Sequence, residues 1–206
     1  MNPIDELANS FMKFPGIGRR QAKRFAYFII QSPPHYVSKL VTQIENIHKH
    51  VRLDPDSFQY FYSTDPSDTK SPLMQDTTRN SKHLMIVEKD VDIESIEKSR
   101  AYHGHYFVLG GLAPLMDTDL ERTIRVTELL KRVEVKATAG DLEEVIFALA
   151  AHPEGDRTAR LIKQKIEPLR ERFGFTISQL GRGFSTGTEV EYSDPETLAS
   201  AFENRK

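Results

Sequence analysis

Residues 84–111 read LMIVEKDVDIESIEKSRAYHGHYFVLGG, and this stretch decides the fold of the chain. It opens with a short apolar run, 84–88, which is typical of a strand that is buried on both faces. Charged and apolar residues then alternate at helical spacing over 92–101, and a second apolar run at 105–111 ends in two glycines. The order strand, helix, strand predicts two parallel strands of one sheet.

The same alternation continues toward the C-terminus. Helical patterns at 120–133 and 156–173 separate two further apolar strands, 143–150 and 175–180. Alternating strands and helices of this kind fold into a parallel sheet with helices on both faces. We therefore predict an α/β domain over 81–180.

The N-terminal residues, 1–52, carry a positive charge. They contain eight Lys or Arg and three Asp or Glu, a net charge of +5, whereas the whole chain of 206 residues has a net charge of -2. We expect helices over 5–14, 19–31 and 36–51, with the first two separated by the sequence PGIG at 15–18. The charge indicates a polyanionic partner, although a solvated helical face would have the same composition.

The PGIG turn and the helix after it form a candidate phosphate-binding site. Gly16 and Gly18 would leave the backbone amides of the first helical turn free to point at phosphate oxygens. Arg20, Lys23 and Arg24 fall on one side of the helix, opposite its apolar residues. This arrangement is typical of the helix-hairpin-helix motif, which holds the DNA backbone without reading bases. The alternative is an ordinary helical turn with a solvated basic face.

Four acidic residues form the second candidate site. Glu88 ends the first strand of the predicted sheet, Asp92 lies in the helix that follows, and Glu154 and Asp156 come after the third strand. The carboxyl ends of parallel strands form the ligand-binding edge of such sheets. The pattern resembles the Toprim domain, whose acids hold Mg²⁺ for phosphoryl transfer. Helix capping or partner contacts are the alternatives, and capping is the expected role of Asp92.

Residues 53–80, between the two regions, are rich in Asp, Ser, Thr and Pro. We expect a loop-rich insert with a short hairpin there. Its aromatic residues could stack on nucleic-acid bases, but we expect them to fill a small local core. They are Phe58, Tyr60, Phe61 and Tyr62.

The composition excludes several kinds of chemistry. The chain has no cysteine, which rules out disulfides, thiolate metal sites and cysteine nucleophiles. No apolar run approaches the roughly 20 residues that span a bilayer. We therefore expect a cytoplasmic protein that does not bind membranes.

The order of these parts resembles the RecR family of bacterial recombination mediators. The resemblance covers nearly the whole chain, and it is clearest at LANSFMKFPGIGRRQAKRFAYFII, in the acidic loop ALAAHPEGDRTA and in the tail sequence EVEYSD. It implies an N-terminal helix-hairpin-helix region, a zinc-finger insert, a Toprim domain and a C-terminal tail at 181–206 that helps to join subunits.

The resemblance also implies a function and partners. RecR proteins bind single- and double-stranded DNA, form dimers or ring-like tetramers that can encircle it, and work with RecO and RecF to load recombinase on single strands. They have no established catalytic turnover, so we expect no enzyme. A metal-dependent Toprim nuclease is the alternative. By position, Arg20 and Arg24 match the DNA-binding residues, and Glu88, Asp92 and Glu154 match the acids used for partner contacts.

The insert departs from the family pattern. RecR proteins carry four zinc-binding cysteines there, in two C-x-x-C pairs. Alignment without gaps backwards from residue 84 puts Gln59, Tyr62, Ser71 and Met74 at these positions, and these are poor zinc ligands. We therefore expect zinc binding to be lost and an aromatic and apolar cluster, including Leu73 and Met74, to hold the insert. No cofactor is expected, with Mg²⁺ at the Toprim acids as the exception left open.

Overall fold

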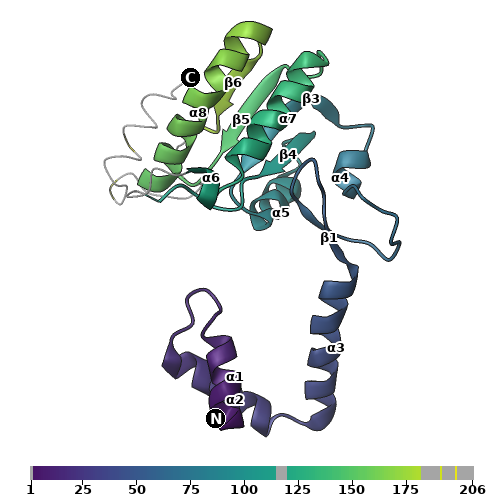
Figure 1. Ribbon diagram of the computed structural model, residues 1–206, viewed down its shortest axis with the longest axis vertical. Helices are drawn as coiled ribbons and strands as arrows, with labels where there is room; N and C mark the ends of the chain where they lie inside the picture. Colours follow the sequence, from purple (N-terminus) through teal and green to yellow (C-terminus); the bar gives the residue numbers. More distant parts are fainter. Residues whose placement is uncertain (1, 115–119, 182–190, 192–197, 199–206) are drawn as a thin grey trace. The chain divides into compact units, whose positions relative to one another are not determined.

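The computed structural model describes residues 2–114, 120–181, 191 and 198 (Figure 1). The chain divides into two compact units, Met1–Val51 and Arg52–Lys206. The predicted insert at 53–80 therefore belongs to the same unit as the sheet. The predicted tail at 181–206 lies almost entirely outside the described residues.

The first unit contains three helices, α1 (Pro3–Phe11), α2 (Arg19–Gln31) and α3 (Pro34–His50). α1 begins earlier than predicted because the side chain of Asn2 accepts a hydrogen bond from the backbone of Ile4 and caps the helix. α1 packs on α2 through three buried alanines, whose small side chains allow the two helices to approach closely. These are Ala8, Ala22 and Ala26.

The second unit starts with the insert. A two-stranded sheet is formed by β1 (Val51–Leu53) and β2 (Tyr60–Tyr62), as the predicted hairpin requires, and the short helix α4 (Pro72–Gln75) follows. Phe58, in the loop between the strands, packs against the core of the sheet domain, with its ring centroid 5.4 Å from that of Phe107. The insert is thus anchored on the neighbouring domain.

A four-stranded parallel sheet forms the centre of this unit, in the order β4-β3-β5-β6 (Figure 1). The strands are β3 (Asn80–Val87), β4 (Gly104–Val108), β5 (Glu144–Ala148) and β6 (Thr176–Gln179). Every pairing between neighbouring strands is parallel, as the alternating sequence pattern predicts. β3 lies in the middle and brings the end of its strand, at Glu88, to the carboxyl edge of the sheet.

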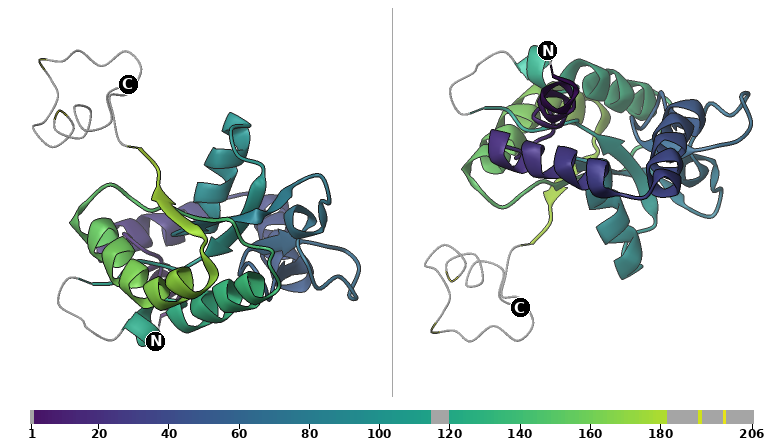
Figure 2. Two further views of the ribbon diagram at one scale, coloured as in Figure 1. Left: turned by 90° about the horizontal axis from the view of Figure 1, so that it is seen from above. Right: turned by 90° about the horizontal axis from the view of Figure 1, so that it is seen from below.

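Helices cover both faces of the sheet (Figure 2). Leu84 and Ile86 of β3 face the larger core, which α7 (Val126–Thr138) and α8 (Pro153–Phe173) complete. Met85 and Val87 face the smaller core, which includes Ile93 of α5 (Asp90–Ser99). The short helix α6 (Leu120–Thr123) precedes α7. Within the described residues, no helix is long and apolar enough to cross a membrane.

Candidate functional site: a basic helix-hairpin-helix turn and an acidic sheet edge

The turn between α1 and α2 has the geometry that the two glycines require. Gly16 has a φ of 76°, a left-handed conformation that favours glycine. Gly18 is the extended N-cap of α2, and no side chain caps the amides of the first helical turn. An added Cβ would meet no atom within 4 Å at either glycine. The backbone here is therefore open to the approach of a ligand.

α2 presents its cations to solvent. Arg20, Lys23 and Arg24 are exposed, whereas Ala22 and Ala26 on the opposite side are completely buried. Lys23 forms an ion pair with Asp5 at 3.4 Å. Arg20 and Arg24 form no ion pair or hydrogen bond with any described residue, so their guanidinium groups are available to an anion. The structure thus brings together all five residues of the predicted phosphate-binding site.

The acids at the start of α5 are engaged locally. The Glu88 carboxylate is 15% exposed and lies 2.6 Å from the Lys89 ammonium. Asp92 accepts a hydrogen bond from the backbone N–H of Lys89 at 2.8 Å, which is the reciprocal half of a capping box. Asp92 therefore caps α5, as the sequence predicts.

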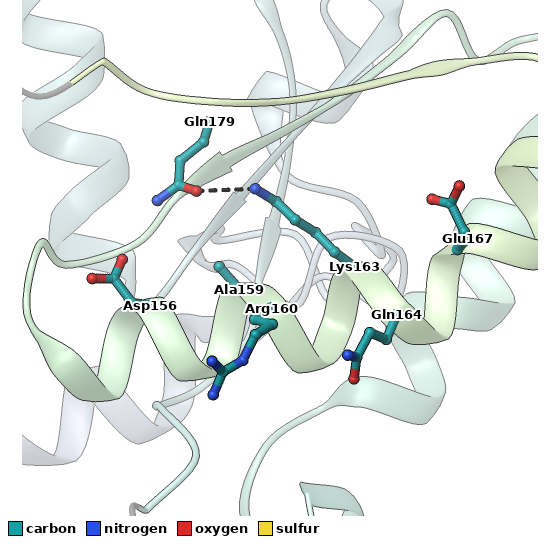
Figure 3. A pocket seen from close by; sticks show the side chains of 7 residues that line it. All are labelled: Asp156, Ala159, Arg160, Lys163, Gln164, Glu167 and Gln179. Atoms are coloured by element: carbon teal, nitrogen blue, oxygen red, sulfur yellow. Dashed lines mark hydrogen bonds between the residues drawn. The ribbon is translucent and has the colours of Figure 1, made fainter. Parts of the chain in front are cut away.

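Glu154 and Asp156 lie in the first turn of α8, where carboxylates interact favourably with the helix dipole. Both are exposed. Asp156 borders a hollow of about 430 Å³ between α8 and the end of β6 (Figure 3). In this hollow the ammonium of Lys163 extends across to the side-chain oxygen of Gln179, 3.0 Å away. Asp156 thus faces a surface that also contains cations.

The four predicted acidic residues do not form a cluster of metal ligands among the residues that the structure describes. Among the residues that the structure describes, no group of three or more His, Asp or Glu side chains is placed to hold a metal ion. Glu88, Glu154 and Asp156 therefore form no such group. Glu154 and Asp156 are exposed at the start of α8.

The insert contains a polar connection that the sequence reading missed. Asp54 is completely buried, and its carboxylate accepts hydrogen bonds from the backbone N–H groups of Asp56, Ser57 and Ser71, at 2.8, 3.0 and 2.6 Å. The Ser71 hydroxyl in turn accepts from the N–H of Met74. The turns 54–57 and 71–74 are thereby joined.

The turn that is joined to Ser71 differs from the segment 59–62 that was assigned to the first zinc-ligand pair. Tyr62 is 67% exposed on β2, so its side chain does not point inward as a zinc ligand would. The turn that faces Ser71 is instead Asp54–Ser57, which has the two-residue spacing of a C-x-x-C pair.

The aromatic residues of the insert do not all share one core, contrary to the expectation. Phe61 is buried and Phe58 packs on the sheet domain, but Tyr60 and Tyr62 are 55% and 67% exposed. Strand alternation explains the difference, because residues i and i+2 lie on the same face of a strand. The expected local cluster is therefore wrong for both tyrosines.

Three family models match the chain. The RecR helix-hairpin-helix model matches residues 4–48, the Toprim domain model 82–180 and the RecR C-terminal model 185–206. These ranges include the turn before α2 and all of the parallel sheet except the first two residues of β3.

Full-length relatives agree with the family models. The chain is 32% identical to the recombination protein RecR of Pediococcus pentosaceus over 203 residues, which cover 98% of this chain and 96% of that protein. It is 32% identical to RecR of Dehalococcoides mccartyi, over 98% of this chain and 93% of the relative. For RecR of Prochlorococcus marinus the identity is 31%, over 98% and 95%. The chain therefore belongs to the RecR family of recombination proteins.

Proposed function

We propose that this protein is a DNA-binding mediator of recombinational repair that grips the phosphate backbone through the turn before α2. The observation that carries the proposal is the position of Arg20 and Arg24, which are exposed and unpaired among the described residues, beside the uncapped amides that follow Gly18. Cations and helix-terminal amides bind phosphate oxygens regardless of base sequence. DNA of any sequence is the expected ligand.

Self-association is the second part of the proposal. No residue of α3 is buried within the unit, and its apolar residues Val41, Ile44 and Ile47 are 49%, 52% and 58% exposed. An apolar helix face of this kind is typical of a protein interface. A second copy of the chain, in a dimer or a ring-like tetramer, would cover it and would multiply the weak DNA contacts of each subunit.

The acidic edge of the sheet is the proposed surface for partner proteins. Glu154 and Asp156 are exposed at the start of α8, and opposite charges on a partner would accelerate encounter and favour the correct orientation. RecO and RecF are the partners that family membership suggests, with recombinase loading on single-stranded DNA as the outcome. Replacing both acids by their amides should weaken capture of RecO, whereas Glu171→Gln, at the other end of α8, should not.

The DNA contact is tested by changing Arg20 and Arg24 to alanine together. We expect weaker binding to any DNA sequence, and the slope of log K against log salt should become less steep by about 0.9 per lost phosphate contact on duplex DNA. Fluorescence anisotropy over a salt titration measures both quantities. Lys98→Ala, at an exposed lysine of α5, is the matched control. An unchanged slope in the double variant would exclude this site.

We also propose that the protein acts without catalytic turnover. The rival, a metal-dependent Toprim nuclease, would use Glu88 and Glu154 at the carboxyl edge of the sheet. Incubation of end-labelled DNA with the protein and Mg²⁺ or Mn²⁺ distinguishes the two. Intact DNA is expected, and cleavage that disappears in Glu88→Gln would establish the nuclease instead.

A further inference from the structure

We propose that Tyr60 and Tyr62 form a stacking face, on which two successive bases of single-stranded DNA lie. The inference rests on the proposed DNA-binding function but concerns a separate surface in the other unit of the chain. It assigns to the insert a direct role in selecting single strands, in addition to the backbone contacts made by α2.

Exposure on one side of β2 is the first observation. Tyr60 and Tyr62 are 55% and 67% exposed, whereas Phe61 between them is 7% exposed and faces the interior. Leu53, on the paired strand β1, is also 40% exposed. Neighbouring exposed aromatic and apolar side chains of this kind are typical of a surface that binds another molecule.

Rigidity is the second observation. The backbone N–H of Tyr60 donates a 2.7 Å hydrogen bond to the carboxylate of Asp90, at the start of α5. Phe58 is fixed between Phe107 and the guanidinium of Arg125, which lies 5.1 Å from the centre of the Phe58 ring. Two contacts therefore fix β2 on the sheet domain, one at its first residue, Tyr60, and one in the preceding loop, at Phe58. Aromatic rings on a fixed strand can accept bases with little loss of entropy.

The spacing of the two rings favours a single strand. Residues i and i+2 of a strand are separated by about 7 Å, at roughly 3.3 Å per residue. Bases in a duplex follow each other at about 3.4 Å, so a stacked duplex cannot place neighbouring bases on both rings. The bases of an extended single strand are unstacked, so two successive bases can lie on the two rings. Aromatic residues on sheets bind single strands in this way.

Two acidic residues of the insert are buried or paired with cations. Asp54 is buried, and Asp56 is paired with Lys70 at 3.0 Å and Arg132 at 3.4 Å, so these two acids present little free negative charge.

The first experiment replaces both tyrosines by alanine. We expect affinity for an oligo-dT probe to fall about tenfold or more, because each stacked base contributes appreciably to binding. The salt slope and the affinity for duplex DNA should stay unchanged, since no phosphate contact is lost. The Arg20→Ala/Arg24→Ala variant should instead have a less steep slope of log K against log salt for both oligo-dT and duplex DNA. An error in the proposed phosphate contact is therefore distinguishable from an error in the proposed stacking.

Conservative variants separate stacking from simple apolar contact. Replacing both tyrosines by phenylalanine should keep oligo-dT affinity, whereas replacing both by leucine should lose it. Equal binding by the leucine and phenylalanine variants would overturn the proposal. A change in molecular mass by light scattering, with oligo-dT affinity unaltered, would also overturn it and would mark the tyrosines as a protein contact.

A fluorescent reporter observes stacking directly. The chain contains no tryptophan, so Tyr62→Trp introduces a single one at the stacking face. Oligo-dT should quench its emission with the same midpoint as the anisotropy titration. The control is Val135→Trp, because Val135 is 54% exposed on α7. Absence of quenching at position 62 while oligo-dT is bound, or equal quenching at both positions, would contradict stacking on this face.

Discussion

The carboxylate of Asp54 accepts a 2.6 Å hydrogen bond from the backbone N–H of Ser71, seventeen residues further along the chain. Both residues are completely buried. The same carboxylate also holds the N–H groups of Asp56 and Ser57, so one side chain joins two turns of the insert. A buried carboxylate with three hydrogen bonds therefore holds the two turns of the insert together.

Loss of this carboxylate should loosen the insert. Asp54→Ala leaves three N–H groups without an acceptor, two of them buried, and we expect the free energy of unfolding to fall by about 3 kcal/mol. Urea denaturation measures the change. Asp65→Ala, at an exposed acid of the same insert, should change it much less. Equal effects of the two substitutions would show that Asp54 does not hold the turns.

Cysteines placed in these turns should create a zinc site. Asp54→Cys, Ser57→Cys, Ser71→Cys and Met74→Cys together supply two C-x-x-C pairs in the turns that the structure joins, and thiolates are strong zinc ligands. We expect one equivalent of zinc by atomic absorption. The matched control has cysteines at positions 59 and 62 in place of 54 and 57, and it should bind less tightly, because β2 turns Tyr62 outward. Similar affinity in both would show that the turns joined by Asp54 are not the better zinc site.

Acid should weaken the contact between the insert and α5. Arg79, 6% exposed, donates to both carboxylate oxygens of Glu97 at 3.0 and 2.7 Å, and the Tyr106 hydroxyl donates to the same carboxylate. Burial alone would raise the pKa of Glu97, but these donors outweigh it and hold the pKa below its usual range. The resulting stability is complete above the unfolded pKa of about 4.3 and is lost as pH falls through the lower folded pKa.

Glu97→Gln should remove that pH dependence. At pH 7 we expect it to lower the free energy of unfolding by about 1–2 kcal/mol, because a buried guanidinium loses its charged partner but keeps one acceptor. The difference from the unchanged protein should shrink as the pH falls below 4. Thermal unfolding across this pH range provides the measurement. Glu94→Gln, on the exposed side of α5, is the control, and a parallel loss at every pH would argue against the ion pair.

A charge on α3 should prevent self-association. Ile44→Glu together with Ile47→Glu places two carboxylates on a face that is already exposed, so the fold of the subunit should persist. Light scattering should report a smaller assembly than for the unchanged protein. Thr42→Glu, on the same helix, serves as the control. An assembly of unaltered mass would locate the interface elsewhere.

Much of this fold follows from sequence periodicity alone. The apolar runs around Leu84, Phe107 and Phe147 are buried in any parallel sheet, so their pattern predicts the strands whatever the details of packing. The cationic side of α2 follows from its 3.6-residue period for the same reason. Local rules also predicted that Asp92 caps a helix. The absence of cysteine likewise excludes a thiolate zinc site without any structure.

Tertiary structure alone decided the state of the insert. Whether Tyr60 and Tyr62 fill a core or face solvent depends on which side of β2 meets the sheet domain, and Phe58 and Phe61 take that side. The role of Asp54 depends on the backbone N–H of Ser71, seventeen residues further along the chain. The residue pattern of the intervening loop does not indicate that these two residues meet. A residue pattern shows the periodicity of one helix or strand. The exposure of the two tyrosines and the contact of Asp54 with Ser71 depend instead on which elements pack against each other.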